Sequence, residues 1–133
     1  MRRVVLDTNI LVSSLWLPNG NPHKVVEKIL SNEIVPYFTE EILEEYNEVL
    51  FREKLAFSPD KVNGLLTEIA EKGILVETSK SMVDFADESD RKFYDTAKAN
   101  SAVLITGNLK HYPNDNEIML AADFLSDESN ENW

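Results

Sequence analysis

Short apolar runs alternate with helix-period segments along nearly the whole chain, and this alternation limits the fold more than any other feature of the sequence. Such alternation is typical of repeated β-α units, which build a mostly parallel sheet. A chain of 133 residues, 43% of them apolar, can bury one core but is too short for two ordinary domains. The sequence therefore predicts one α/β domain.

The predicted elements follow from the period of the apolar residues and from the capping residues at their ends. Strands are expected at residues 3–6, 34–38, 74–77, 103–105 and, as a short fifth strand, 117–120. Helices are expected at residues 9–17, 22–30, 40–51, 59–72, 90–100 and 121–125. A polar stretch at residues 79–89 precedes the fifth helix.

The net charge of −11, from 24 acids and 13 bases, argues against a protein that grips nucleic acid by neutralising phosphates. Part of the excess lies in residues 127–133, which lack apolar periodicity and are expected to form a disordered acidic tail after a domain at residues 1–126. Negative charge is also what a cation site requires. A basic partner chain could supply the missing phosphate contacts.

The sequence also limits the cellular setting and the metal ligands. No apolar stretch approaches the roughly 20 residues that span a bilayer, and Met1 leads directly into a strand, so we expect no membrane segment, no secretory signal and a cytoplasmic protein. The chain has no cysteine. Any metal must therefore bind oxygen ligands or the two histidines, His23 and His111.

Two acids stand where a surface acid is not expected. Asp7 follows a buried-type strand, which places it at the carboxyl end of that strand, where open parallel sheets bind ligands. Asp90 falls within the arc of Phe93 and Ala97, roughly 60° from Phe93 at about 100° per residue, so its carboxylate lies on the buried face of its helix. Each could instead cap the helix that follows it. Asp95 projects about 200° from Phe93 and is expected to face solvent.

On the helix from residue 40, Glu45 is the acid nearest the apolar stripe, only about 40° outside it beside Val49. The other glutamates of this helix indicate a solvated acidic face, and taken alone Glu45 fits that interpretation slightly better than a role in a site. Three carboxylates brought together would raise each other's pKa unless a cation neutralised them. Oxygen ligands select Mg²⁺ or Mn²⁺, which suit phosphodiester hydrolysis.

Taken in order, residues 4–12 (VVLDTNILV), residues 40–45 (EEILEE), Asp90 and residues 103–108 (VLITGN) resemble the motifs of the PIN-domain family. The resemblance covers nearly the whole chain and is closest to the PIN proteins that act as toxins of toxin-antitoxin systems, relatives of the VapC-type toxins. Each motif is weak, but their combined order is specific.

The resemblance implies a three-layer α/β/α sandwich around a four- to five-stranded parallel sheet, and a nuclease acting on single-stranded RNA. Asp7, Glu45 and Asp90 match family acids that bind Mg²⁺ or Mn²⁺. Asn108 stands where many members carry Asp, and an amide oxygen binds a cation more weakly than a carboxylate does. Asn108 is thus a candidate fourth metal ligand that puts a second metal and the activity itself in question.

Other polar residues near these motifs have two interpretations each. Asn9 and Thr106 are expected beside the carboxylates, where they would orient water or a ligand, although a turn role fits them equally well. Lys110 and His111 could contact phosphate, although an exposed loop carries such residues anyway. His23, at a helix start, is expected to be plain surface.

The leading hypothesis is an endoribonuclease in which metal-activated water attacks the phosphorus and leaves a 5′-phosphate and a 3′-hydroxyl. A small antitoxin protein and a homodimer are the partners that the resemblance implies. One alternative is a catalytically silent PIN-like module that binds RNA or protein, which Asn108 and the acidic balance favour. A second alternative, a haloacid-dehalogenase-like phosphatase, would need Asp where Asn9 stands.

Overall fold

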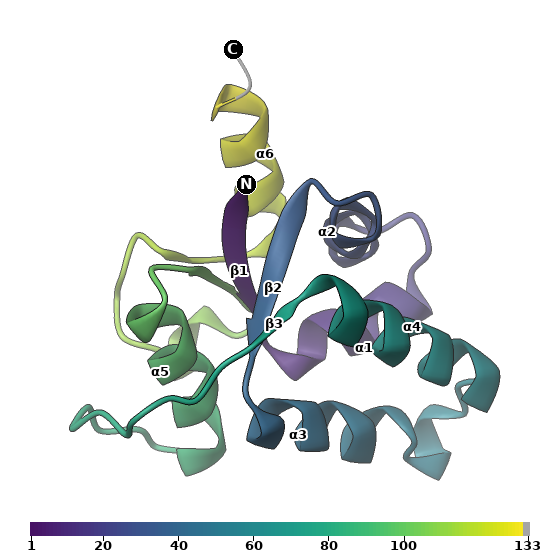
Figure 1. The fold of residues 1–133 in the computed structure, drawn as a ribbon, viewed down its shortest axis with the longest axis horizontal. Coiled ribbons are helices and arrows are strands. Elements are labelled where there is room, and N and C mark those ends of the chain that lie inside the picture. Colours follow the sequence, from purple (N-terminus) through teal and green to yellow (C-terminus); the bar gives the residue numbers. More distant parts are fainter. Residues whose placement is uncertain (132–133) are drawn as a thin grey trace.

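The computed structural model describes residues 1–131 and contains a five-stranded parallel sheet in the order β3-β2-β1-β4-β5 (Figure 1). The strands are β1 (Arg2–Leu6), β2 (Ile34–Phe38), β3 (Ile74–Leu75), β4 (Val103–Ile105) and β5 (Ile118–Met119). The first two strands after β1, β2 and β3, are added on one side of it, and the last two, β4 and β5, are added on the other side. The carboxyl end of β1 therefore lies at the point where the strand order reverses, which is where open α/β sheets bind ligands.

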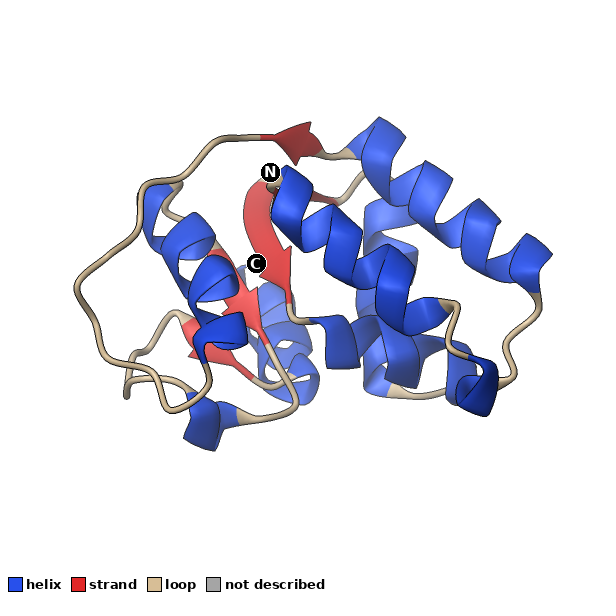
Figure 2. Cartoon of the chain, turned by 90° about the horizontal axis from the view of Figure 1, so that it is seen from below, coloured by secondary structure: helices blue, strands red, loops and turns tan. Residues whose placement is uncertain are grey.

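Helices cover both faces of the sheet and complete the three-layer α/β/α arrangement that the family resemblance implied. They are α1 (Thr8–Trp16), α2 (Asn21–Leu30), α3 (Glu40–Leu50), α4 (Pro59–Lys72), α5 (Arg91–Ala99) and α6 (Ala121–Glu131). Figure 2 shows α5 on one side of the strands, with α1, α2 and α4 on the other. Helix α3 starts directly below β2 and lies across the end of the sheet.

The core is built around β1, whose residues Val4, Val5 and Leu6 are at most 1% exposed. A strand that is buried on both faces needs apolar side chains at successive positions, because neither face meets water. Phe93 of α5 packs on one side of the sheet, while Ile29 of α2 is buried on the other. The central strand is thereby fixed in place, and its last residue directs the chain into the site described below.

The final helix corrects the prediction of a disordered tail from residue 127. Helix α6 continues to Glu131, and residues 132–133 lie outside the described part. Its start is anchored because Phe124 is fully buried. The Arg2 guanidinium lies over the Phe124 ring and forms ion pairs with Asp127 at 2.8 Å and with Glu128 at 3.5 Å. These acids lie beside a cation from the opposite end of the chain, a contact that periodicity within the segment does not reveal.

The prediction that Asp95 faces solvent was also wrong. Asp95 is only 5% exposed, and its carboxylate accepts a hydrogen bond of 3.0 Å from the backbone N–H of Ser81. The polar stretch at residues 79–89 passes over the outer face of α5 and is fastened there by Arg91, which donates to Ser81 O and Val83 O. A surface position on an isolated helix is thus covered by a neighbouring loop.

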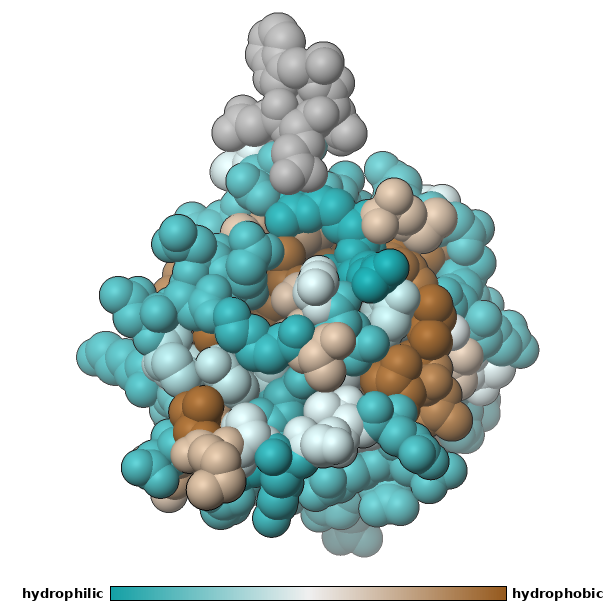
Figure 3. Space-filling view, turned by 60° about the vertical axis from the view of Figure 1, so that its left-hand side comes forward, coloured by the Kyte–Doolittle hydropathy of each residue, from teal (hydrophilic) through white to brown (hydrophobic). Residues whose placement is uncertain are grey.

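Strand β3 is shorter than predicted, because only Ile74 and Leu75 are in the strand, although Val76 N–H still donates to Phe38 O at 2.9 Å. Among the described residues, no helix combines the length and the apolar character needed to cross a membrane. The face shown in Figure 3 is mainly hydrophilic.

We predict that Gly73→Ala destabilises the fold by about 1–3 kcal/mol, because it overpacks the junction between α4 and β3. A Cβ atom at this position would lie 2.6 Å from Pro36 O and 2.3 Å from the Phe38 ring. Gly64→Ala in α4 is the matched control, since nothing lies within 4 Å of its Cβ position. It should stabilise the protein by about 0.5–1 kcal/mol through helix propensity. Urea unfolding of both variants checks this prediction, and equal effects would contradict it.

Candidate active site

Asp7 occupies the carboxyl end of the central strand. Its backbone N–H donates to Ile105 O of β4 at 3.0 Å, so the residue stands between β1 and β4 at the reversal of strand order. Asp7 also stands at the N-cap position of α1, but its side chain makes no capping hydrogen bond, so the alternative role as a helix cap is not what the carboxylate does here. Its carboxylate instead bonds to residues from the far end of the chain, which a local cap does not require.

Two hydroxyl groups hold the Asp7 carboxylate in place. Thr106 Oγ1 donates to Asp7 Oδ2 at 2.8 Å, and the Tyr112 hydroxyl donates to the same oxygen at 2.9 Å. Asp7 is nonetheless only 7% exposed, and burial raises the pKa of its carboxyl above the usual value, with a further contribution from Glu45. Burial raises the pKa of Tyr112 far above its usual range, and the negative charge of Asp7 raises it further. Tyr112 is therefore a fixed hydrogen-bond donor.

Glu45 reaches the site from α3. The Thr39 hydroxyl caps this helix by accepting from Ile42 N–H at 3.2 Å, and Tyr46 ties the helix to β1 by donating to Leu6 O at 2.6 Å. These contacts aim the half-buried Glu45 side chain toward the end of β1, as its place beside the apolar stripe predicted. The Thr8 hydroxyl donates to Glu45 Oε2, and the Lys92 ammonium forms an ion pair with Oε1 at 2.8 Å.

Asp90 reaches the site from the turn that precedes α5. The residue is 8% exposed, in agreement with its predicted place on the buried face, and it holds the N-cap position of α5 without a side-chain capping bond. Its Oδ2 atom lies 3.3 Å from His111 Nδ1. Burial raises the pKa of the Asp90 carboxyl, and the negative charges of Asp7 and Asp87 raise it further.

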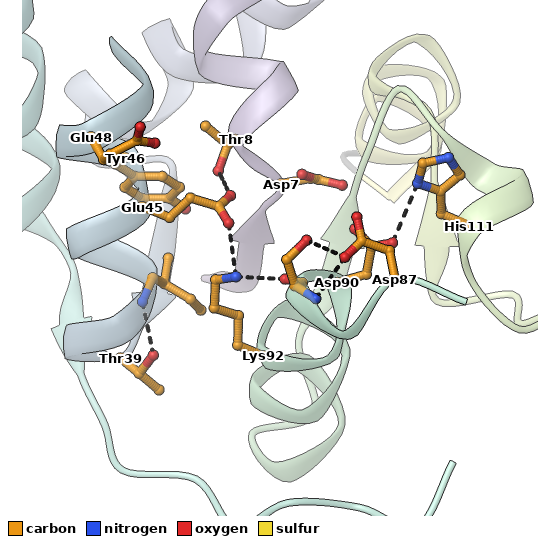
Figure 4. Close-up of polar contacts among 12 residues, drawn as sticks. Asp7, Thr8, Thr39, Glu45, Tyr46, Glu48, Asp87, Asp90, Lys92 and His111 are labelled. Carbon is orange, nitrogen blue, oxygen red and sulfur yellow. Dashed lines mark hydrogen bonds and ion pairs between the residues drawn. The ribbon is translucent and has the colours of Figure 1, made fainter. Parts of the chain in front are cut away.

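The three acids thus surround one end of β1, arriving from β1, α3 and the start of α5 (Figure 4). Among residues 1–131, no three acidic or histidine side chains are grouped closely enough to hold a metal ion together as they stand. The donor chemistry still fits Mg²⁺ or Mn²⁺, because Asp7 and Asp90 offer hard oxygen ligands and Mg²⁺ needs only one or two carboxylates. Burial raises the pKa of both carboxyls, and a neighbouring acid adds to each rise, Glu45 at Asp7 and Asp7 at Asp90, so a bound cation would stabilise the ionised carboxylates.

The structure distinguishes among the other residues that the sequence singled out. Thr106 contacts Asp7 directly, whereas the Asn9 side chain accepts from Gly107 N–H at 3.0 Å and fastens α1 to the loop after β4. Asn108 is exposed, and its backbone N–H donates to Thr106 Oγ1 at 3.0 Å. Asn108 is therefore linked to Asp7 through the Thr106 hydroxyl, which contacts both residues.

The basic candidates differ in the same way. His111 contacts Asp90, and its ring is half exposed at the rim of the site. Lys110 is exposed on the same short turn. His23 lies within α2, with ring contacts to Ser14 O at 3.2 Å and to Glu27 at 3.4 Å, so it belongs to the α1–α2 contact.

Sequence reasoning missed three residues that touch the acids. Thr8 lies within the quoted 4–12 motif, and its position next to Asp7 was the available signal. Lys92 lies two residues after Asp90 on the same helix, and its charge beside the predicted site could have suggested a pairing. Tyr112 gave no signal, because its contact with Asp7 joins residues 105 positions apart.

Two comparisons with known proteins agree with this arrangement. Residues 3–110 match the PIN domain family. The chain is also 30% identical over 109 residues to an uncharacterised protein of Methanocaldococcus jannaschii, and the match covers 80% of this chain and 70% of that protein.

We predict that Asp7→Asn gains stability over the natural protein as the pH rises, in the absence of metal. A raised pKa means that the fold favours protonated Asp7, so the stability of the natural protein falls as the pH rises from the usual carboxyl value of 3.8 through the raised one. An amide has no such penalty, and its oxygen can still accept from Thr106 and Tyr112. Melting temperatures between about pH 4 and pH 7 test this, with exposed Asp60→Asn as the control. A difference that does not change with pH would contradict the prediction.

Proposed function

The chain belongs to the PIN-domain family, a family of nucleases, and on that premise we propose that it is a metal-dependent endoribonuclease that cuts single-stranded RNA. The observation that carries the proposal is the group of three acids, Asp7, Glu45 and Asp90, at the end of the central strand. Burying carboxylates near one another costs stability. A cation bound between Asp7 and Asp90 would offset part of this cost.

In the proposed site, Asp7 and Asp90 hold Mg²⁺ or Mn²⁺, and Glu45 is the third acid. When bound, the ion would activate water and neutralise the charge that develops on the phosphate. The residues of the chain supply the positioning. Tyr112, which stays protonated, and Thr106 keep the Asp7 carboxylate oriented through their hydrogen bonds.

Two basic residues near the acids support the proposal that the substrate is RNA. His111 and Lys110 lie on the short turn that follows β4, and His111 contacts Asp90. In the proposed complex with RNA, both residues contact phosphate groups next to the scissile bond. The net charge of −11 opposes tight binding of RNA by the bare protein. We therefore propose that specificity comes from local contacts at this rim rather than from a broad basic surface.

The biological setting that fits this proposal is a toxin-antitoxin pair in the cytoplasm, with the chain as the toxin. A small basic antitoxin protein would complement the acidic surface. We further propose that the chain forms a homodimer. An adjacent reading frame for a small DNA-binding protein would support the pairing, and light scattering of the purified protein tests the dimer.

We predict that Glu45→Gln lowers Mn²⁺-dependent cleavage of single-stranded RNA by about 10- to 100-fold, as expected when an acid beside the metal loses its charge. Glu44→Gln is the matched control, because Glu44 is the neighbouring acid on α3 and is exposed. It should retain nearly full activity. The measurement is the initial rate of cleavage of a labelled RNA with and without Mn²⁺. Equal losses in the two variants would assign the effect to the helix rather than to the site.

Asn108 provides the test between an active nuclease and a silent binding module. We predict that Asn108→Asp lowers the Mn²⁺ concentration needed for half-maximal cleavage, because a carboxylate added near Asp7 attracts the cation. The same change should slightly lower the melting temperature without metal through added repulsion. Titration of cleavage and melting against Mn²⁺ measures both effects. An unchanged metal dependence would place Asn108 outside the site, and activity found only in the variant would favour the silent module.

A further inference from the structure

Lys92 places a cation inside the group of acids. Its side chain is 10% exposed, and its ammonium lies 2.8 Å from Glu45 Oε1 and 2.5 Å from the backbone carbonyl oxygen of Ser89 (Figure 4). Its charge also lies 5.0 Å from the centre of the Phe93 ring. These three contacts hold the ammonium between α3 and the turn before α5.

This ion pair differs from the other ion pairs that involve lysine. The side chains of Lys28 and Lys98 are 23% and 46% exposed in their ion pairs, against 10% for Lys92. Surface pairs of that kind contribute little to stability. The Lys92–Glu45 pair is more shielded from water, so its attraction is stronger and the removal of one partner leaves the other charge uncompensated.

Both oxygens of Glu45 are engaged. Lys92 holds Oε1, and the Thr8 hydroxyl donates to Oε2. Among the described residues, the side-chain contacts of Asp7 and Asp90 each involve Oδ2 alone. Two of the three acids thus keep an oxygen free of side-chain contacts, whereas both oxygens of Glu45 already have a side-chain partner and one of these partners is a cation.

We propose that Lys92 is a positioning residue that acts through Glu45 and competes with the divalent ion for that carboxylate, so that it sets the affinity of the site for metal. This inference rests on the proposed metal-dependent function. An ammonium group and a divalent cation repel each other when they approach the same carboxylate. For Glu45 Oε1 to join Asp7 and Asp90 as a metal ligand, Lys92 must leave that atom. The free energy needed to break the ion pair then lowers the affinity of the site for metal.

The test measures metal binding rather than cleavage. Free Mn²⁺ is followed by electron paramagnetic resonance during titration of the metal-stripped full chain. We expect Lys92→Met to bind Mn²⁺ about tenfold more tightly, because repulsion and competition are both removed. Lys92→Arg retains the charge and should bind Mn²⁺ as the natural protein does. Lys98→Met is the control, since Lys98 is a lysine of the same helix that pairs with Asp115 instead.

A second readout keeps the proposal testable if Lys92→Met is less stable. Without metal, this variant should melt about 3–6 °C lower than the natural protein, because Glu45 loses its counter-charge. Saturating Mn²⁺ should raise its melting temperature by more than it raises that of the natural protein. Circular dichroism at a temperature below both transitions confirms that the two proteins are folded alike.

The results separate this inference from the proposed function. Weaker or unchanged Mn²⁺ binding by Lys92→Met, with normal binding by the natural protein, overturns the role of Lys92 and leaves the metal-dependent function standing. Mn²⁺ binding by Lys92→Met but not by the natural protein supports competition between Lys92 and the metal for Glu45. If neither protein binds Mn²⁺, both the inference and the proposed function are overturned.

Discussion

Carboxylates that are withdrawn from water must be compensated, and this constraint organises the whole end of the sheet. Asp7 is fixed in place by the central strand, so the chain brings groups to it. Thr106 and Tyr112 donate to its carboxylate, Lys92 neutralises Glu45, and His111 contacts Asp90. Without these partners the burial of the acids would be too costly.

The compensating groups come from separate elements, which makes the site dependent on the tertiary fold. Thr106 follows β4, Tyr112 follows the short turn after it, and Lys92 lies on α5. Helix α5 has a further contact of this kind, because Arg91 ties the 79–89 segment to it through Ser81 and Val83. The site thus depends on contacts between elements that are far apart in the chain, as expected at the reversal of strand order.

The excess of acidic residues over basic ones is distributed unevenly over this fold. Part of the negative charge is compensated within the protein, as when α6 places Asp127 and Glu128 beside Arg2. Another part is collected at the site, where it favours cations over bare phosphate. A net charge of −11 therefore describes neither the site nor the surface by itself, and the positions of the acids decide what they do.

The sequence by itself determined the β-α alternation, most element bounds and the places of Asp7, Glu45 and Asp90, because periodicity and capping act between residues close together in the chain. Membership of the PIN-domain family was expected from the order of its motifs. Only the tertiary structure decided the environment of each acid. Tyr112 and Lys92 reach their partners across 105 and 47 positions, and the covering of Asp95 depends on a loop. Contacts of that range leave no periodic signal, since they arise only when distant segments pack together.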